Sequence, residues 1–185
     1  MHIRTTIVAA TGAALFATAV ASAQCPPEFV FADSGQILGV GSAGSMAVGD
    51  VDGDGDADVV IPNRAVTFGD TVPNEIWLNA GNGTFYDSGQ RLGGASTANA
   101  MLEDFNGDGH LDIYFMDGGI SWPPPPHTIW MNDGTGTFTP GDQIQAFYSS
   151  VATGDVDGDG DVDLVLPGYD QPGKVMLNDG SGSFT

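Results

Sequence analysis

The sequence predicts an all-β protein built from four-stranded antiparallel blades, the architecture of a β-propeller. Two observations predict it. A nine-residue acidic segment occurs three times, at residues 50–58, 104–112 and 155–163, and a short apolar strand and a glycine-rich turn follow each copy at a similar distance. The segments begin 54 and 51 residues apart. A repeat of about 40 to 55 residues holding four short strands is typical of a propeller blade, whereas the main alternative, a β-solenoid, has repeats of about nine residues.

Each acidic segment follows the pattern D-x-[DN]-x-D-G-x-x-D, with oxygen-bearing side chains at positions 1, 3, 5 and 9. Two carboxylates about 4 Å apart repel by roughly 1 kcal/mol in bulk water and by more near a protein surface, so an empty segment of this kind is strained. Ca²⁺ takes six to eight oxygen ligands in flexible geometry. The sequence therefore predicts about three calcium ions, one per segment. The candidate metal residues are Asp50, Asp52, Asp54, Asp56, Asp58, Asp104, Asn106, Asp108, His110, Asp112, Asp155, Asp157, Asp159, Asp161 and Asp163.

The first half of the pattern also opens an EF-hand, which requires a glutamate at position 12 and a helix on each side. Position 12 is apolar in all three copies, and the residues after position 9 form short apolar runs that are typical of buried strands. These twelfth residues are Ile61, Phe115 and Leu166. The segments are therefore predicted to be strand-to-strand loops, and neither EF-hand nor dockerin-like loops.

Four strands, A to D, are expected in each repeat. Strand A precedes the acidic loop, as at residues 98–102, and strand B follows it. Strand C is expected at residues 76–79, 129–132 and 175–178, each ending in asparagine. Strand D begins after a tight glycine turn, which reads Gly81-Asn-Gly-Thr-Phe85 in the first copy and recurs in the other two.

The acidic loop, the apolar strand and the following L-N-x-G-x-G-x-F together resemble the FG-GAP and VCBS-type repeats of the integrin α-subunit N-terminal β-propeller superfamily. The resemblance covers residues 29–185. It implies that each acidic loop joins the two inner strands of a blade, and that its ligands are the side chains at positions 1, 3, 5 and 9 with one backbone carbonyl. The carbonyl would come from position 7, occupied by Asp56, His110 and Asp161, which explains how a histidine is accommodated there.

Propellers of this superfamily usually have about seven blades and need at least four, but this sequence holds three acidic loops. Residues 31–36 match residues 85–90, which predicts an unpaired outer strand D at the start of the repeats, as if a partner from the far end were to close the ring. The expectation is a fragment of a roughly seven-bladed ring with exposed strand edges. Closure of the ring by oligomerisation is the alternative.

Residues 1–23 have the features of a signal peptide, with Arg4 ahead of an apolar stretch and an A-x-A site that predicts cleavage after Ala23. A retained membrane helix and a lipid anchor on Cys25 are the less favoured alternatives. No other stretch is long and apolar enough to cross a bilayer. The protein is therefore expected to be secreted, periplasmic or on the cell surface, without membrane insertion after cleavage. The repeats would occupy residues 24–185.

The chain has a net charge of −20, and 13 of its 24 acidic residues lie in the three loops. Such a chain lacks the basic patches that nucleic acid requires, so nucleic acid is excluded as a partner. Cys25 is the sole cysteine, which rules out an internal disulfide and leaves calcium as the expected stabiliser.

No catalytic constellation is present in the sequence: it has neither an H-E-x-x-H motif nor a G-x-S-x-G motif. Trp77 and Trp130, at equivalent places in strand C, are interpreted as blade-to-blade packing in preference to a sugar-stacking platform. Residues 122–127 (Trp-Pro-Pro-Pro-Pro-His) form either a recognition loop or a rigid connector. We expect an exported, calcium-binding scaffold for binding or adhesion, whose B–C and D–A loops meet a carbohydrate or an extracellular protein. The alternatives are part of a secreted propeller-type polysaccharide lyase or hydrolase, and a structural spacer.

Overall fold

The computed structural model describes residues 32–39, 41–67, 70–94, 96–118, 125–145, 150–168 and 172–185. The chain divides into two units, Met1–Ser34 and Gly35–Thr185, and every strand belongs to the second. The predicted signal peptide, Cys25 and Trp122 lie outside the described residues. Within the described part of the chain there is no helix, and so none that is long and apolar enough to span a membrane.

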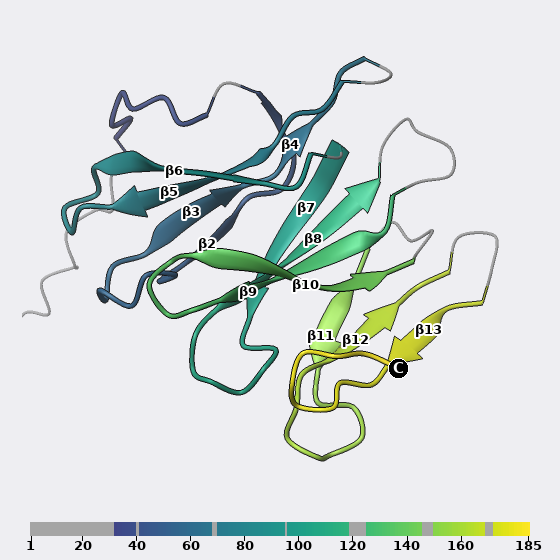
Figure 1. Cartoon of the computed structure of the whole chain (residues 1–185). Coiled ribbons are helices and arrows are strands. Elements are labelled where there is room, and N and C mark those ends of the chain that lie inside the picture. Colours follow the sequence, from purple (N-terminus) through teal and green to yellow (C-terminus); the bar gives the residue numbers. More distant parts are fainter. Residues whose placement is uncertain are drawn as a thin grey trace, which may run out of the picture. The chain divides into compact units, whose positions relative to one another are not determined.

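Thirteen β-strands make up the described regular structure (Figure 1). They are β1 (Ser42–Ala43), β2 (Ala47–Gly49), β3 (Asp58–Ile61), β4 (Asn63–Arg64), β5 (Asn74–Asn79), β6 (Phe85–Leu92), β7 (Ser96–Glu103), β8 (Asp112–Gly118), β9 (His127–Asn132), β10 (Phe138–Ile144), β11 (Ala152–Gly154), β12 (Asp163–Leu166) and β13 (Lys174–Met176).

These strands form three successive antiparallel sheets, which we call blades 1 to 3. Blade 1 has the order β2-β3-β5-β6 and blade 2 the order β7-β8-β9-β10, so both are four-stranded meanders. Blade 3 contains β11-β12-β13, and a single bridge between Asn178 and Phe184 marks the start of its fourth strand. The predicted order A-B-C-D within each repeat is confirmed. A small pair of β1 with β4 was not predicted.

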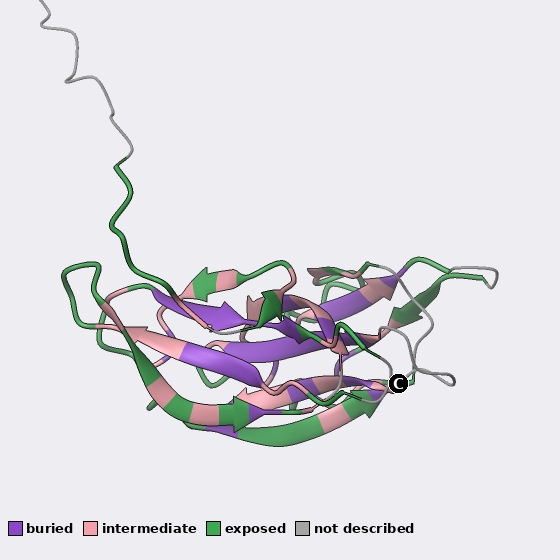
Figure 2. Ribbon diagram, turned by 90° about the horizontal axis from the view of Figure 1, so that it is seen from above, coloured by how far each residue is buried: buried purple, intermediate pink, exposed green. Residues whose placement is uncertain are grey.

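The packing between blades follows the two-residue period of the strands. On β8, Ile113 and Phe115 belong to a buried cluster shared with Val60 and Ile76 of blade 1. The alternate residue Tyr114 belongs to a second cluster, which it shares with residues of blade 3. Because the second strand of a blade is covered on both faces, it reads as a continuous apolar run. Figure 2 shows strands that are buried along most of their length, as β3 and β8 are, and others that are mostly exposed or intermediate, as β6 is.

Trp130 packs against the cluster between blades 1 and 2, as the blade-packing interpretation predicts. Trp77 is half-buried, and its indole N–H donates to Glu75 Oε2 over 2.9 Å. Trp77 thus makes a contact within its own blade, whereas its counterpart Trp130 lies in a seam between blades.

A glutamine side chain ties each outer strand to the next glycine turn. Gln90 Nε2 donates to the Gly136 carbonyl, and Gln90 Oε1 accepts from the Phe138 N–H over 3.0 Å. Gln36 makes the same pair of bonds to the turn of blade 1. Residues 32–39 pair with no described strand, so the outer strand expected from the match with residues 85–90 has no partner here.

Candidate metal sites

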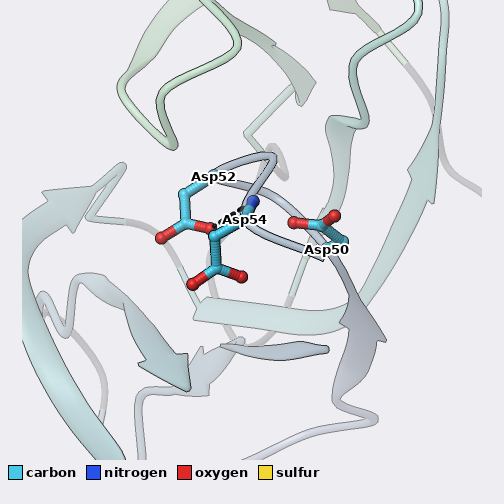
Figure 3. A group of neighbouring side chains, drawn as sticks. All are labelled: Asp50, Asp52 and Asp54. Atoms are coloured by element: carbon cyan, nitrogen blue, oxygen red, sulfur yellow. Dashed lines mark hydrogen bonds between the residues drawn. The ribbon is translucent and has the colours of Figure 1, made fainter. Parts of the chain in front are cut away.

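The first acidic loop brings three carboxylates together at the end of β2. Asp50, Asp52 and Asp54 each offer one oxygen, and these oxygens lie within 4.8 Å of one another (Figure 3). Gly53 and Gly55 have φ angles of 76° and 94°, a left-handed conformation that lets the loop turn this tightly. The predicted convergence of the residues at positions 1, 3 and 5 is therefore present in this loop.

Backbone N–H groups hold these carboxylates in place. Both oxygens of Asp50 accept hydrogen bonds, from Gly53 at 2.8 Å and from Gly55 at 3.0 Å. Asp52 and Asp54 each use Oδ1 to accept the N–H two residues further on, which leaves their second oxygens for another partner. The pKa of Asp52 is raised, first by burial and then by repulsion from the neighbouring aspartates. The negative charges of this loop therefore repel one another when no cation is bound.

The third loop repeats this geometry. One oxygen each from Asp155, Asp157 and Asp159 again lie within 4.8 Å of one another. The two oxygens of Asp155 accept from Gly158 and Gly160, at 2.6 and 3.2 Å. Two loops separated by a whole blade thus fold into the same arrangement of oxygen donors.

The middle loop differs at position 3, where asparagine replaces aspartate. Asn106 Nδ2 donates to Asp108 Oδ2 over 3.0 Å, and Asp104 accepts from the backbone N–H groups of Asp108 and Gly109. The middle loop therefore presents fewer negative charges than the other two, and one oxygen of Asp108 already accepts a hydrogen bond from the Asn106 side chain.

The ninth residue of each loop is a fully buried aspartate, and its carboxylate joins the loop to strand C. In loop 1, Asp58 Oδ2 accepts from the Val51 N–H over 2.9 Å and Oδ1 from the Asn79 N–H over 2.8 Å. Asp112 and Asp163 make the matching pairs of bonds. These N–H bonds lower the pKa of Asp163, whereas burial outweighs them and raises the pKa of Asp112 in the central blade. None of the three belongs to a carboxylate triad.

The side chains at position 7 lie against the glycine turn of their own blade. A Cβ atom on Gly134 would lie 2.5 Å from His110 Nε2, and one on Gly81 would lie 2.9 Å from Asp56 Oδ2. Asp161 lies in the same way against Gly180. These side chains stay outside the triads, which is compatible with the expectation that position 7 supplies its backbone carbonyl.

The asparagine that ends strand C recurs in all three repeats, but the sequence alone assigned it no role. Asn132 Oδ1 accepts the N–H of Gly134, and Asn132 Nδ2 donates to two loop carbonyls. Its recurrence at the same place in all three L-N-x-G-x-G-x-F segments was the available signal. Its role depends on which backbone atoms the fold brings next to it.

A separate cavity of about 220 Å³ lies between blades 2 and 3. Most of its lining residues belong to the ends of β10 and β12 and to β13, toward the B–C and D–A ends of the blades. Apolar and polar side chains line it together. They are Asp142, Gln143, Ile144, Gln145, Leu166, Lys174, Met176 and Phe184.

A family model described as FG-GAP-like repeat matches the chain twice, at residues 65–115 and 104–166. Together the two matches cover more than half of the 185 residues. The chain belongs to the FG-GAP-like repeat family. A search of curated proteins found no match.

Among solved structures, the FG-GAP chain is similar to a lectin of Agrocybe aegerita, described in terms of its specific recognition of non-reducing terminal N-acetylglucosamine. The TM-score is 0.51 and the sequence identity 24%. The similarity covers 76% of this chain and 36% of that structure. At this identity the likeness shows the fold alone, which is that of a partial β-propeller.

Proposed function

We propose that this FG-GAP protein is an exported, calcium-stabilised β-propeller scaffold that binds carbohydrate or an extracellular protein. The observation that carries the calcium part is the same convergence of three carboxylate oxygens in loops 1 and 3. Hard oxygen donors on a flexible, glycine-containing loop fit Ca²⁺ better than they fit a thiophilic metal or one that prefers imidazole.

In loop 1 the ion would be held by Asp50, Asp52 and Asp54, with Asp58 and the position-7 carbonyl of Asp56 as the expected further ligands. Loop 3 offers the equivalent residues. The middle loop has one carboxylate fewer at position 3, and since calcium affinity rises with ligand charge, it would bind most weakly. The bound ion supplies positive charge that offsets repulsion among the aspartates.

Calcium removal tests this proposal. Because the ion binds the folded loops and not the unfolded chain, calcium at about 100 times its dissociation constant would add about 2.7 kcal/mol per site to the free energy of unfolding. Chelator is therefore expected to lower the melting temperature, and calcium to restore it. The double variant D52N/D157N should lose most of this response, while D133N, which removes a negative charge from a glycine turn, should keep it. A melting temperature that is indifferent to chelator would refute calcium stabilisation.

The cavity between blades 2 and 3 supports the binding part of the proposal. It combines hydrogen-bonding groups such as Gln143 and Lys174 with the apolar side chains of Ile144 and Leu166, a mixture that suits the polar and apolar faces of a sugar. The propeller fold shared with a lectin makes carbohydrate the first ligand class to test.

A glycan array probed with the exported protein, with and without calcium, tests this part. Binding is expected to need calcium and to weaken in the cavity variant K174A, while R64A, at a position outside the cavity lining, should bind like the wild type. An array without signal would eliminate the carbohydrate class and leave a protein ligand. N-terminal sequencing of the exported product tests cleavage after Ala23.

A further inference from the structure

We infer that the asparagine ending strand C couples the calcium loops of adjacent blades, so that the three loops bind calcium as linked sites. This inference rests on the proposed calcium binding. It concerns Asn132 at the seam between blades 1 and 2, and Asn178 at the seam between blades 2 and 3.

Asn132 contacts two acidic loops at once. Its Nδ2 donates to the Val51 carbonyl in the loop of blade 1 over 2.7 Å, and to the Leu111 carbonyl in the loop of its own blade over 3.0 Å. Its backbone N–H donates to Asp112 Oδ1 over 2.8 Å. One buried side chain therefore spans the two loops.

Asn178 repeats the arrangement one blade further on. Its Nδ2 donates to the Phe105 carbonyl of the middle loop over 2.8 Å and to the Val162 carbonyl of its own loop over 3.0 Å. Its backbone N–H donates to Asp163 Oδ1 over 2.8 Å. The same three bonds at two seams, with nearly the same lengths, show that the contact is a feature of the repeat.

The carbonyls that receive these bonds lie between ligand positions. Val51 is the residue between Asp50 and Asp52, so a hydrogen bond to its carbonyl orients the peptide group that leads into Asp52. The seam is also tightly packed there, because a Cβ on Gly136 of blade 2 would lie 3.1 Å from Asp52 Cβ. An outer contact that orients metal ligands commonly changes metal affinity by about 10- to 100-fold when it is removed.

The outermost blades provide internal controls. Asn79 of blade 1 donates to the Ala57 carbonyl of its own loop, and among the described residues its Nδ2 bonds to no second loop. At the other side, Val156 of loop 3 is 49% exposed, whereas its equivalents Val51 and Phe105 are each 1% exposed beneath the following blade. Among the described residues the bridging contact is therefore present at two seams, and the coupling is inferred for these.

Coupling between the loops follows from this contact. Calcium that orders loop 1 holds the Val51 carbonyl in place for Asn132, and an ordered Asn132 in turn holds the Leu111 carbonyl in loop 2. Calcium bound in loop 1 has then already ordered part of loop 2, so calcium binding to loop 2 loses less conformational entropy. This is positive cooperativity. The coupling free energy must be the same in both directions.

Calcium titration followed by NMR tests the inference loop by loop. The amides of Gly55, Gly109 and Gly160 serve as reporters, because each donates to the first aspartate of its own loop. With N132A, calcium affinity should fall about tenfold at Gly55 and Gly109 and by clearly less at Gly160, which the coupling reaches only through loop 2. N178A should affect Gly109 and Gly160 more than Gly55. N79A should affect Gly55 most, because Asn79 bonds to the loop of its own blade.

If the wild type binds calcium but the titration of Gly55 is unchanged in N132A, the coupling is overturned. If no reporter glycine of the wild type responds to calcium, the proposed calcium binding itself is overturned. If N132A does not fold, the ligand variant D52N decides. Coupling predicts that D52N also lowers the calcium affinity of loop 2, read at Gly109, and independent loops predict no change there.

Discussion

Single buried polar residues, as much as the apolar core, decide the local structure of each blade. At the ends of the strands opposite the acidic loops, Thr97 Oγ1 donates to Asp117 over 2.5 Å, and the Tyr114 hydroxyl contacts His127 Nδ1 over 2.5 Å. Burial raises the pKa of Asp117 to about 6 and lowers the pKa of His127 to about 4. Both shifts favour the neutral forms, because charge is poorly solvated there.

These shifts predict opposite contributions to the pH dependence of stability. Asp117 has a higher pKa in the folded state than its ordinary 3.8, so its contribution is present at low pH and is lost as the pH rises through about 6. His127 has a lower pKa than its ordinary 6.5, so its contribution is lost as the pH falls from 6.5 toward 4.

The variant D117N isolates the first of these contributions. The unfolding free energy of the wild type minus that of D117N should decrease between pH 4 and pH 7, by about 1 to 3 kcal/mol. Urea unfolding in chelator at both pH values measures it without the linkage to calcium. The H127Q difference should change with pH in the opposite sense, and a D117N difference that is flat with pH would contradict the assignment.

At the scale of elements, each blade is fastened to the next by contacts from its outer strand and from its acidic loop. The outer strand of blade 1 contributes Gln90, whose side-chain amide donates to the Gly136 carbonyl and accepts from the Phe138 N–H, as the backbone of a neighbouring strand would. In blade 3 the Phe184 N–H is met instead by Asp142 Oδ2, at 3.0 Å. The phenylalanine N–H thus keeps a side-chain acceptor from the preceding outer strand, although Asp142 lies one residue before the position equivalent to Gln90.

Replacing the glutamine should therefore loosen the seam. Q90A leaves the N–H of the buried Phe138 without its partner, and we expect a loss of about 1 to 3 kcal/mol in the free energy of unfolding. Q36A removes the same pair of bonds at an exposed place, where water can replace them, and should cost clearly less. Equal losses for the two variants in urea unfolding would show that burial does not set the strength of this contact.

At the scale of the molecule, the blades depend on one another because each buried cluster is shared between two of them. Charge also acts across the whole molecule, since the chain carries −20 and 13 of its 24 acidic residues lie in three loops. Self-repulsion of this size opposes the compact state and is weakened by salt.

The salt dependence of stability should consequently change with calcium. In chelator, raising sodium chloride from about 0.01 M to 1 M, which shortens the screening length from about 30 to 3 Å, should raise the melting temperature. With calcium bound, the same change should have a much smaller effect, because the ions already offset the loop charge. Thermal unfolding at the two salt concentrations, with and without calcium, measures both. An equal rise in both conditions would locate the repulsion outside the loops.

The sequence by itself determined the repeat, the order of strands within a blade and the positions of the acidic loops. These are local properties: alternating aspartates, glycines with left-handed φ and apolar runs act through neighbours in the chain. Even the interpretation of Trp130 as packing between blades followed from its repeated register.

Tertiary structure alone decided how the blades are joined. That the ninth aspartate holds the Asn79 N–H, or that Asn132 reaches the Val51 carbonyl 81 residues away, depends on which backbone atoms the fold brings together. Backbone carbonyls and N–H groups are nearly the same in every residue, so no sequence pattern identifies which of them a distant side chain will bind. For the same reason residues 32–36 resemble an outer strand in sequence but pair with no described strand, because a paired strand requires a neighbour as well as a composition.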